Sequence, residues 1–245
     1  MNSTVIIGAT SALAQSIAKI HASNKEDLVL VGRDRDRLQS ISTDLTIRGA
    51  ASCGVFSLDL ADTDRHNQLW EDIYARVKRP DIVYVCHGIL PDQGQCERSY
   101  DDTLASLQVN ALSVISLLTG LANRMEQDRH GKIVVISSVS GDRGRKSNYV
   151  YGTAKGTVSI FLQGLRNRLF SHNVSVITVK PGFIDTPMTA HFKKGFLWAT
   201  ADKVAADIVK GVKRNRNVIY TPFIWLFIML IIKSIPESIF KRLSL

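Results

Sequence analysis

Three side chains between Ser138 and Lys155 have types and spacing that suit proton transfer. Tyr151 and Lys155 are four positions apart, so on a helix they share one face and can address the same ligand. A phenol ordinarily has a pKa of about 10, and a nearby ammonium favours the phenolate and lowers that pKa. We expect Ser138, at the end of a neighbouring strand, to hold a carbonyl oxygen. The set predicts acid–base chemistry on an alcohol or ketone oxygen; the alternative is an ordinary surface pair on a helix.

The N-terminus has the pattern of a nucleotide-binding turn. Thr4 to Ile7 form a β-branched apolar run that predicts a buried strand, and a helical stretch from Ser11 to His21 follows the turn that begins at Gly8. A helix N-terminus offers free N–H groups and a positive dipole end to a pyrophosphate. Strand, tight turn and helix are typical of dinucleotide binding. The glycine pattern is degenerate, so a plain strand-to-helix turn is the alternative.

Strand and helix patterns alternate along the whole chain of 245 residues. Strands are predicted at Thr4–Ile7, Leu28–Val31, Ala51–Ser57, Ile82–Cys86, Lys132–Ser137, Val174–Val179 and Asn217–Thr221. Helices are predicted at Ser11–His21, Arg35–Arg48, Asp62–Arg79, Tyr100–Asp128, Ser147–His172 and Thr200–Arg214. This alternation predicts an α/β fold, a Rossmann-type doubly wound parallel sheet of about seven strands with helices on both faces. We assign residues 1–217 to one catalytic domain and 218–245 to a last strand and an apolar C-terminal segment.

Together these patterns resemble the short-chain dehydrogenase/reductase family over nearly the whole chain. The family's glycine motif corresponds to Ile7–Ala14, where Gly8 matches and Ala12 and Ala14 replace the later glycines. The family's strand-end motif corresponds to Val85–Gly88, where only Gly88 matches. The C-terminal motifs are intact. We therefore expect an active enzyme with an unusual phosphate loop.

The resemblance implies a role for each matching residue. Ser138, Tyr151 and Lys155 correspond to the catalytic residues, and Asn110 to the asparagine that holds a water in the proton relay. Thr186 corresponds to the threonine that reaches the nicotinamide carboxamide. Asp59 corresponds to an adenine-edge contact, with a helix N-cap as its alternative role. The cofactor contacts implied in this way are Gly8, Thr10, Ser11, Ala12, Leu13, Arg33, Asp59, Leu60, His87, Gly88, Tyr151, Lys155, Pro181, Gly182, Ile184 and Thr186.

The end of the second strand bears on the choice of cofactor. An acid at this position binds a free ribose 2′-hydroxyl, whereas a base binds a 2′-phosphate. Gly32 stands where NAD-selective relatives place the acid, and Arg33 can fork onto a phosphate. Asp34 is expected to point away. These residues favour NADPH and NADP over NADH; the alternative for Arg33 is a solvated charge in a loop.

The composition and charge argue against several other classes of function. Three scattered cysteines and six histidines give neither a disulfide framework nor the spacing of a metal site. The formal net charge is +9, but no basic helix or aromatic platform suggests nucleic-acid binding. The first residues lead directly into a strand, so we expect no signal peptide and a cytoplasmic location. The resemblance also implies a homodimer or homotetramer formed through Tyr100–Asp128 and Ser147–His172.

The C-terminus contains ten consecutive apolar residues, from Phe223 to Ile232. A helix needs about twenty residues to span a bilayer, so this run is too short to cross alone. Trp225 and the flanking cations suit an interfacial position, and the basic charge suits an anionic leaflet. We therefore expect a peripheral location on the inner face of the cytoplasmic membrane. The alternative is that the segment packs on the protein's own surface or in a dimer interface.

The loop before Tyr151 carries Arg143, Arg145 and Lys146. Three cations beside a substrate pocket suit a phosphate group on the substrate; alone, the loop would be interpreted as solvated charge. Together with the apolar C-terminus, these cations predict a substrate with an anionic head and a lipid tail.

A narrower resemblance joins these features. The loop up to Lys155, the turn from Pro181 to His191 and the closing residues from Ile235 to Leu245 look like the reductase component of decaprenylphosphoryl-ribose 2′-epimerase systems. This implies NADPH-dependent reduction of the 2-keto sugar of a polyprenyl-phosphoryl pentose in cell-envelope polysaccharide synthesis, with a flavin-dependent oxidase as partner. The alternatives are a generic ketoreductase for acyl or small carbonyl substrates, a non-catalytic nucleotide sensor or scaffold, and an assembly partner that holds a flavoenzyme near its lipid.

Overall fold

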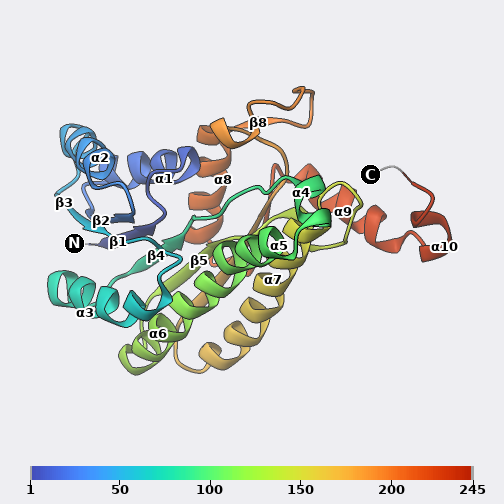
Figure 1. Ribbon diagram of the computed structural model, residues 1–245. Coiled ribbons are helices and arrows are strands. Elements are labelled where there is room, and N and C mark those ends of the chain that lie inside the picture. Colours follow the sequence, from blue (N-terminus) through green and yellow to red (C-terminus); the bar gives the residue numbers. More distant parts are fainter. Residues whose placement is uncertain (1, 244–245) are drawn as a thin grey trace.

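A seven-stranded parallel sheet forms the centre of the protein, in a computed structural model that describes residues 2–243 (Figure 1). The strand order is β3-β2-β1-β4-β5-β6-β9, so the chain reverses its direction of progress between β1 and β4. Ligands bind at such a switch point, at the carboxyl ends of the strands. The strands are β1 (Ser3–Ile7), β2 (Asp27–Gly32), β3 (Ser52–Ser57), β4 (Ile82–Val85), β5 (Lys132–Ile136), β6 (Ser175–Pro181) and β9 (Val218–Thr221).

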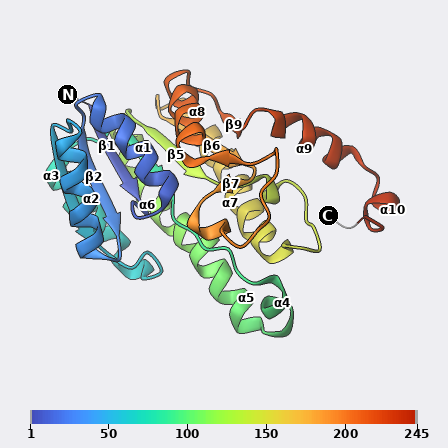
Figure 2. The same ribbon diagram turned by 90° about the horizontal axis from the view of Figure 1, so that it is seen from above.

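Helices cover both faces of the sheet (Figures 1 and 2). One core packs the sheet against α3 (His66–Val77), α6 (Ser113–Asp128) and α7 (Tyr149–Phe170). A second core packs the other face against α1 (Ala12–Ser23), α2 (Arg35–Ile47) and α8 (Ala201–Lys213). The inner strands, from β2 to β6 in the sheet order, are buried on both faces, which is why they are mostly apolar runs without alternation, whereas the edge strands β3 and β9 are only partly buried.

All seven predicted strands are confirmed, and so are the six helical regions. The stretch Tyr100–Asp128 differs from the prediction because it is not α-helical throughout. It consists of α5 (Tyr100–Leu107), a π-helix at Gln108–Leu112, and α6. A π-turn of this kind is common at functional sites.

The structure adds elements that the sequence patterns did not indicate. They are α4 (Gln93–Arg98), the short pair β7 (Ile184–Asp185) and β8 (Ala199–Thr200), α10 (Glu237–Phe240), and 3-10 helices at Thr63–Arg65, Val139–Gly141 and Pro187–Thr189. The apolar C-terminal run forms the helix α9 (Ile224–Ser234). Trp225 and Met229 of α9 are buried in a small third cluster with Val139, so one face of this segment packs on the protein itself.

One helical run in the described part of the chain, Tyr100–Asp128, is long and apolar enough to cross a membrane, because it contains an 18-residue window with a mean hydropathy of 1.6. Its buried residues, which include Leu117, Leu118 and Leu121, belong to the first core. Length and hydropathy also characterise central helices of this kind, so this finding is weak evidence for a membrane span.

Candidate active site

The structure brings together Ser138, Tyr151 and Lys155. Ser138 follows β5, caps the 3-10 helix Val139–Gly141, and accepts a hydrogen bond from the Ser140 amide at 3.0 Å. Tyr151 and Lys155 lie in the first turns of α7, and Tyr151 shares a side-chain hydrogen bond with Ser138. The Lys155 Nζ is 5.7 Å from the centroid of the Tyr151 ring. The arrangement that the residue spacing predicted is therefore present.

Lys155 is held by the strand in front of it. Its side chain is buried, with 4% of the residue exposed, and the Nζ donates a hydrogen bond to the Ile136 carbonyl at 3.1 Å. Burial disfavours the ammonium and lowers the pKa of Lys155 to about 8. The side chain is therefore charged at neutral pH but close to losing that charge.

The pKa of Tyr151 is raised, whereas we expected the neighbouring Lys155 to lower it. Burial raises the pKa of its phenol to about 12, and the hydrogen bond with Ser138 offsets only part of this effect. Lys155 does not lower this pKa in the structure. Burial disfavours the charged forms of both side chains, and the Lys155 ammonium donates its hydrogen bond to the Ile136 carbonyl. Tyr151 is consequently a protonated phenol at neutral pH, which is the form that donates a proton.

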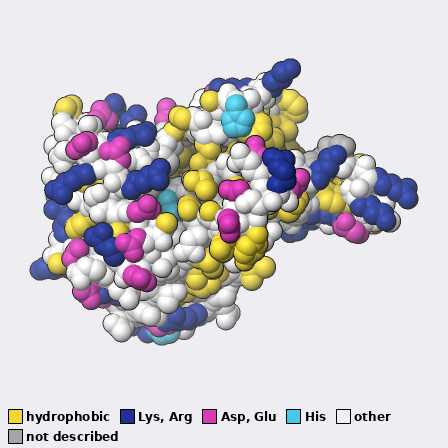
Figure 3. Space-filling view, viewed as in Figure 1, with side chains coloured by type: hydrophobic (Ala, Val, Ile, Leu, Met, Phe, Trp, Pro, Cys, Tyr) yellow, Lys and Arg dark blue, Asp and Glu magenta, His cyan; other side chains and the backbone are white. Residues whose placement is uncertain are grey.

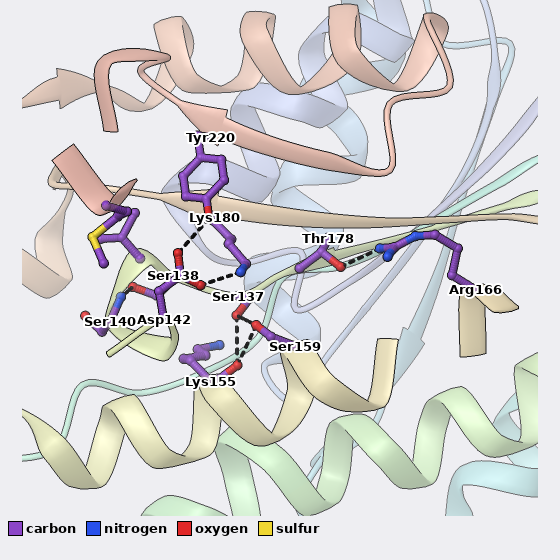
Figure 4. Close-up of polar contacts among 12 residues, drawn as sticks. Ser137, Ser138, Ser140, Asp142, Lys155, Ser159, Arg166, Thr178, Lys180 and Tyr220 are labelled. Carbon is purple, nitrogen blue, oxygen red and sulfur yellow. Dashed lines mark hydrogen bonds and ion pairs between the residues drawn. The ribbon is translucent and has the colours of Figure 1, made fainter. Parts of the chain in front are cut away.

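Serines that sequence reasoning missed fix the position of α7. The Ser137 and Ser159 hydroxyls donate hydrogen bonds to the Lys155 carbonyl at 3.0 and 2.8 Å, as Figure 4 shows. Ser137, which follows β5, therefore ties the end of that strand to α7 at Lys155 and Ser159. The adjacent pair Ser137–Ser138 at a strand end was the available signal.

Two glycines allow the loop and the helix to approach. A Cβ at Gly141 would stand 2.6 Å from the Lys155 carbonyl carbon, and one at Gly152 would stand 2.8 Å from the Ser140 carbonyl oxygen. Neither backbone atom can move aside without displacing α7 or the loop after Ser138. Glycine at both positions therefore sets the distance between Ser138 and α7.

Asn110 lies in the π-helix and is fully buried. Its Oδ1 accepts a hydrogen bond from the Ile89 amide at 2.9 Å. A Cβ at Gly88 would stand 2.7 Å from that Oδ1 and 3.3 Å from the Lys155 Nζ, so Asn110 and Lys155 border one small space beside Gly88. The water-mediated proton relay through Asn110 stays a prediction.

The glycine turn is built around one obligatory glycine. Gly8 has φ +77°, and a Cβ there would stand 2.6 Å from the His87 amide nitrogen. The Gly8 amide donates to the Val31 carbonyl at 2.8 Å, which fixes the turn to β2. Ala14 is fully buried in the core of the α1 face, so an alanine methyl fits at the position that corresponds to the last glycine of the resembled motif.

The N-terminus of α1 follows this turn directly. Ser11 caps the helix by accepting a hydrogen bond from the Ala14 amide at 3.2 Å, and the Thr10 carbonyl accepts one from Gln15. Ala12 and Leu13 are the first helical residues, and their amides have no carbonyl partner within the helix. Such amides at the positive end of a helix suit a pyrophosphate.

The cofactor-selecting positions lie at the ends of β2 and β3. Arg33 is exposed, and Asp34 caps α2 by accepting a hydrogen bond from the Arg37 amide at 3.0 Å, so Asp34 is directed to its own helix as expected. Asp59 is exposed and accepts a hydrogen bond from the Ala61 amide at 3.0 Å. It does not cap the next helix, because Asp62 precedes that helix. Leu60 is buried.

His87 stands at the end of β4, against Gly8. Its Nε2 is 2.7 Å from the Ser113 hydroxyl, while its Nδ1 is buried without a hydrogen-bond partner among the described residues. Burial lowers the pKa of His87 to about 3, so the ring is neutral. The free Nδ1 is a polar atom that a bound ligand could satisfy.

The turn after β6 joins the site to the C-terminal helix. Pro181 ends β6, and the Gly182 amide donates to the Thr221 carbonyl at 3.1 Å. Any side chain on Gly182 would overlap the Trp225 indole. Ile184 lies in β7, and Thr186 caps the next 3-10 helix, where Thr189 fixes the turn through a hydrogen bond to the Ile184 carbonyl at 2.6 Å.

The guanidinium groups of Arg143 and Arg145, two of the three predicted substrate cations, contact other parts of the protein. The Arg143 Nη1 donates to the Ile232 and Ile235 carbonyls, both at 2.6 Å, and its Nη2 pairs with Glu237 at 3.0 Å. The Arg145 Nη2 lies 3.6 Å from the Met229 sulfur. Arg143 is therefore committed to the C-terminal segment, contrary to its expected role at a substrate phosphate. The role of Arg145 stays a prediction, since its Nε has no partner among the described residues. Lys146 is exposed on the same loop.

Asp142, in the same loop, belongs to a buried network (Figure 4). Its carboxylate forms an ion pair with Lys180 of β6 and accepts a hydrogen bond from the Tyr220 hydroxyl at 2.7 Å. These contacts link the loop after Ser138 to β6 and β9. Sequence reasoning could not find this set, because its members are distant along the chain.

The described residues fit a dinucleotide across the switch point. The Gly8 turn, the free amides of α1 and the unsatisfied His87 Nδ1 line one end, and Lys155 and Tyr151 the other. No three His, Cys, Asp or Glu side chains within residues 2–243 gather as metal ligands.

Comparisons with known proteins agree with this geometry. The chain is 30% identical over 244 residues to an uncharacterized oxidoreductase of Streptomyces coelicolor, covering 98% of this chain and 95% of that protein. An uncharacterized oxidoreductase of Mycobacterium tuberculosis is 28% identical over 239 residues, 98% and 96% of the two chains. A short-chain dehydrogenase from Sphingobium yanoikuyae, solved with NADPH, has a TM-score of 0.82 at 22% identity, covering 97% of this chain and 98% of that chain.

The family assignment rests on the match to a whole family rather than on one relative. The family model described as short chain dehydrogenase matches residues 2–195, which include the Gly8 turn, Asn110, Ser138, Tyr151 and Lys155. The matched part therefore contains the strands of the switch point and the catalytic helix. The chain belongs to the short-chain dehydrogenase family of oxidoreductases.

Proposed function

We propose that this protein reduces a ketone to a secondary alcohol with NADPH. The observation that carries the proposal is the convergence of Ser138, Tyr151 and Lys155 at the end of β5, with Tyr151 protonated at neutral pH. A protonated phenol is the form that donates a proton to the substrate oxygen in the reducing direction. The NADPH in the structural relative and the exposed Arg33 support the choice of cofactor.

Each residue has one step in this mechanism. NADPH, when bound, supplies the hydride to the carbonyl carbon. The Ser138 hydroxyl orients the ketone oxygen, and the Tyr151 O–H donates its proton to that oxygen as the alcohol forms. Lys155, held by the Ile136 carbonyl, keeps a positive charge beside the phenol while the proton leaves. Asn110 borders the same space. We expect it to hold the water through which Tyr151 is reprotonated.

We further propose a substrate with an anionic head and a long apolar tail, namely the 2-keto sugar of a polyprenyl-phosphoryl pentose. The segment between β7 and β8 supports this substrate. It exposes Phe192 and Phe196, at 47% and 93%, beside the exposed Lys193. Aromatic and cationic side chains in one loop suit an amphiphilic ligand. We propose that this loop takes the substrate-binding role first expected of Arg143 and Arg145. A flavin-dependent oxidase would supply the ketone from the corresponding alcohol.

The test is NADPH oxidation with this 2-keto sugar, generated in place by a flavoenzyme, and in parallel with a simple soluble ketone. The wild type should turn over both, and Tyr151→Phe should lose turnover while it still binds NADPH. Turnover of the simple ketone alone would keep the reductase and discard the lipid-linked sugar, in favour of a generic ketoreductase. Full activity of Tyr151→Phe would remove the mechanism.

A further inference from the structure

The helix α9 is apolar on two opposite faces. Trp225 and Met229 are buried against the loop after Ser138, whereas Phe227, Leu230 and Ile231 on the other side are 54%, 56% and 65% exposed. At 3.6 residues per turn, the exposed residues from Phe223 to Ile231 lie within about 120° of the helix circumference. A helix that is apolar all round requires cover on both sides, and only one side is covered by the protein.

The exposed face has basic neighbours. Lys233 lies in the last turn of α9, and Lys241 and Arg242 follow α10; all three are exposed. Figure 3 shows Lys and Arg side chains gathered at the α10 end of the molecule. The acidic residue of this segment, Glu237, is paired with Arg143. The apolar face is thus bordered by cations in excess of acids.

We propose that α9 docks on an anionic phospholipid bilayer with this face. An apolar helix face bordered by Lys and Arg suits the boundary between headgroups and acyl chains, and each cation near an anionic surface contributes about 1 kcal/mol. A second copy of this chain fits less well. A symmetric interface would place the same cations on both sides, in a protein of net charge +9.

The covered face of α9 connects this surface to the active site. Trp225 lies against Gly182, and Met229 lies against Arg145 and packs with Val139, the residue after Ser138. Arg143 holds the C-terminal end of the same helix through the Ile232 and Ile235 carbonyls. A bilayer under the outer face would therefore lie one helix thickness, about 10 Å, from the residues that border the catalytic loop. A substrate could therefore place its head group in the site while its tail stays in the bilayer.

The experiment is flotation of the full chain with vesicles of phosphatidylcholine alone and of phosphatidylcholine with phosphatidylglycerol. The matched pair of variants is Ile231→Asp on the exposed face and Ile47→Asp at the opposite end of the molecule, where Ile47 is 82% exposed. We expect the wild type and Ile47→Asp to float with the anionic vesicles and not with the neutral ones. Ile231→Asp should bind about tenfold more weakly, and about 1 M salt should release the wild type.

The outcomes are separable from the proposed reductase activity, because flotation needs neither NADPH nor a ketone. Equal flotation of Ile231→Asp and the wild type, or no flotation of the wild type at low ionic strength, would overturn the proposal. A wild-type dimer that becomes monomeric in Ile231→Asp, without vesicle binding, would assign the face to a second copy and overturn it too. Leu230→Gln repeats the test with an uncharged side chain if Ile231→Asp lowers the Tm.

Discussion

The Trp225 indole lies against the backbone of Gly182, so closely that a side chain on Gly182 would overlap it. Trp225 belongs to the C-terminal helix α9, and Gly182 to the turn after β6 that borders the active site. Phe183 completes the contact, with its ring centroid 5.1 Å from that of Trp225 in an edge-to-face arrangement. The C-terminal segment is therefore packed against the turn after β6 rather than being a separate appendage.

Gly182→Ala should displace Trp225 and lower both stability and turnover. Insertion of a methyl group into a packed contact typically costs about 1–3 kcal/mol in the free energy of unfolding. Trp225→Leu makes room for that methyl, so the double variant should lose less stability than the two single variants together. Urea unfolding of all four proteins measures this coupling.

Gly164→Ala is the matched control, since a Cβ there meets nothing within 4 Å. This helical position should be neutral or stabilised by up to about 1 kcal/mol. Strictly additive losses in Gly182→Ala and Trp225→Leu would contradict the contact.

Arg143→Ala should release the C-terminal segment rather than weaken substrate binding. The guanidinium bonds the Ile232 and Ile235 carbonyls, pairs with Glu237, and lies 3.7 Å from the centroid of the Phe240 ring. Because the side chain is largely buried, its removal should cost about 2–3 kcal/mol. Limited proteolysis should then cleave near α10.

Arg143→Lys offers a control that keeps the charge but not the fork. It should retain only part of the stability, because a lysine cannot reach several carbonyls at once. A large rise in KM for a phosphorylated substrate, with unchanged unfolding and proteolysis, would instead return Arg143 to the role that its position in the sequence first suggested.

The parallel sheet could be expected from the sequence because each central strand is a short apolar run beside a helical pattern. Val29 and Val31 of β2, for example, are fully buried, and both neighbouring residues are buried too. The π-helix could not be expected, because Tyr100–Asp128 keeps one apolar stripe through it. Only the backbone of Gln108–Leu112 shows that Asn110 is turned inward.

The proximity of Tyr151 and Lys155 could be expected, because a spacing of four positions on a helix is a local relationship. The role of Arg143 could not be expected, because its partner Ile232 is 89 positions away. A charged loop has the same sequence pattern whether it faces solvent or a buried partner. The pKa of Tyr151 also escaped prediction, because its direction depends on burial, which a local pattern does not report.

Arg33→Ala should raise KM for NADPH and leave KM for NADH nearly unchanged. Arg33 is exposed at the end of β2, and Asp34 beside it is committed to the cap of α2. Loss of a forked contact to a 2′-phosphate is worth about 2 kcal/mol, which corresponds to about a 30-fold rise in KM. Steady-state kinetics with both cofactors measure the ratio.

Arg48→Ala, at the other end of α2, is the control for the change in charge. It should leave both KM values within about twofold, because charges farther away than about 10 Å are screened by salt. Equal effects of Arg33→Ala on NADPH and NADH would count against the 2′-phosphate site.

The pH dependence of ketone reduction should follow Lys155 rather than Tyr151. Burial raises the pKa of Tyr151 to about 12, so this phenol keeps its proton throughout the neutral range. Burial lowers the pKa of Lys155 to about 8, so its ammonium is lost as the pH rises through that value. Because kcat/KM reports groups in the free enzyme, it should be constant below about pH 7 and fall above about pH 8.

Lys155→Arg separates the two groups. A guanidinium stays charged at every accessible pH, so the fall near pH 8 should disappear even though the variant is slower, by about 100-fold, because of its altered geometry. The reverse reaction should respond in the opposite way. Alcohol oxidation needs the phenolate of Tyr151, so its rate should still rise with pH in Lys155→Arg. A fall near pH 8 that survives in Lys155→Arg would assign that titration to another group.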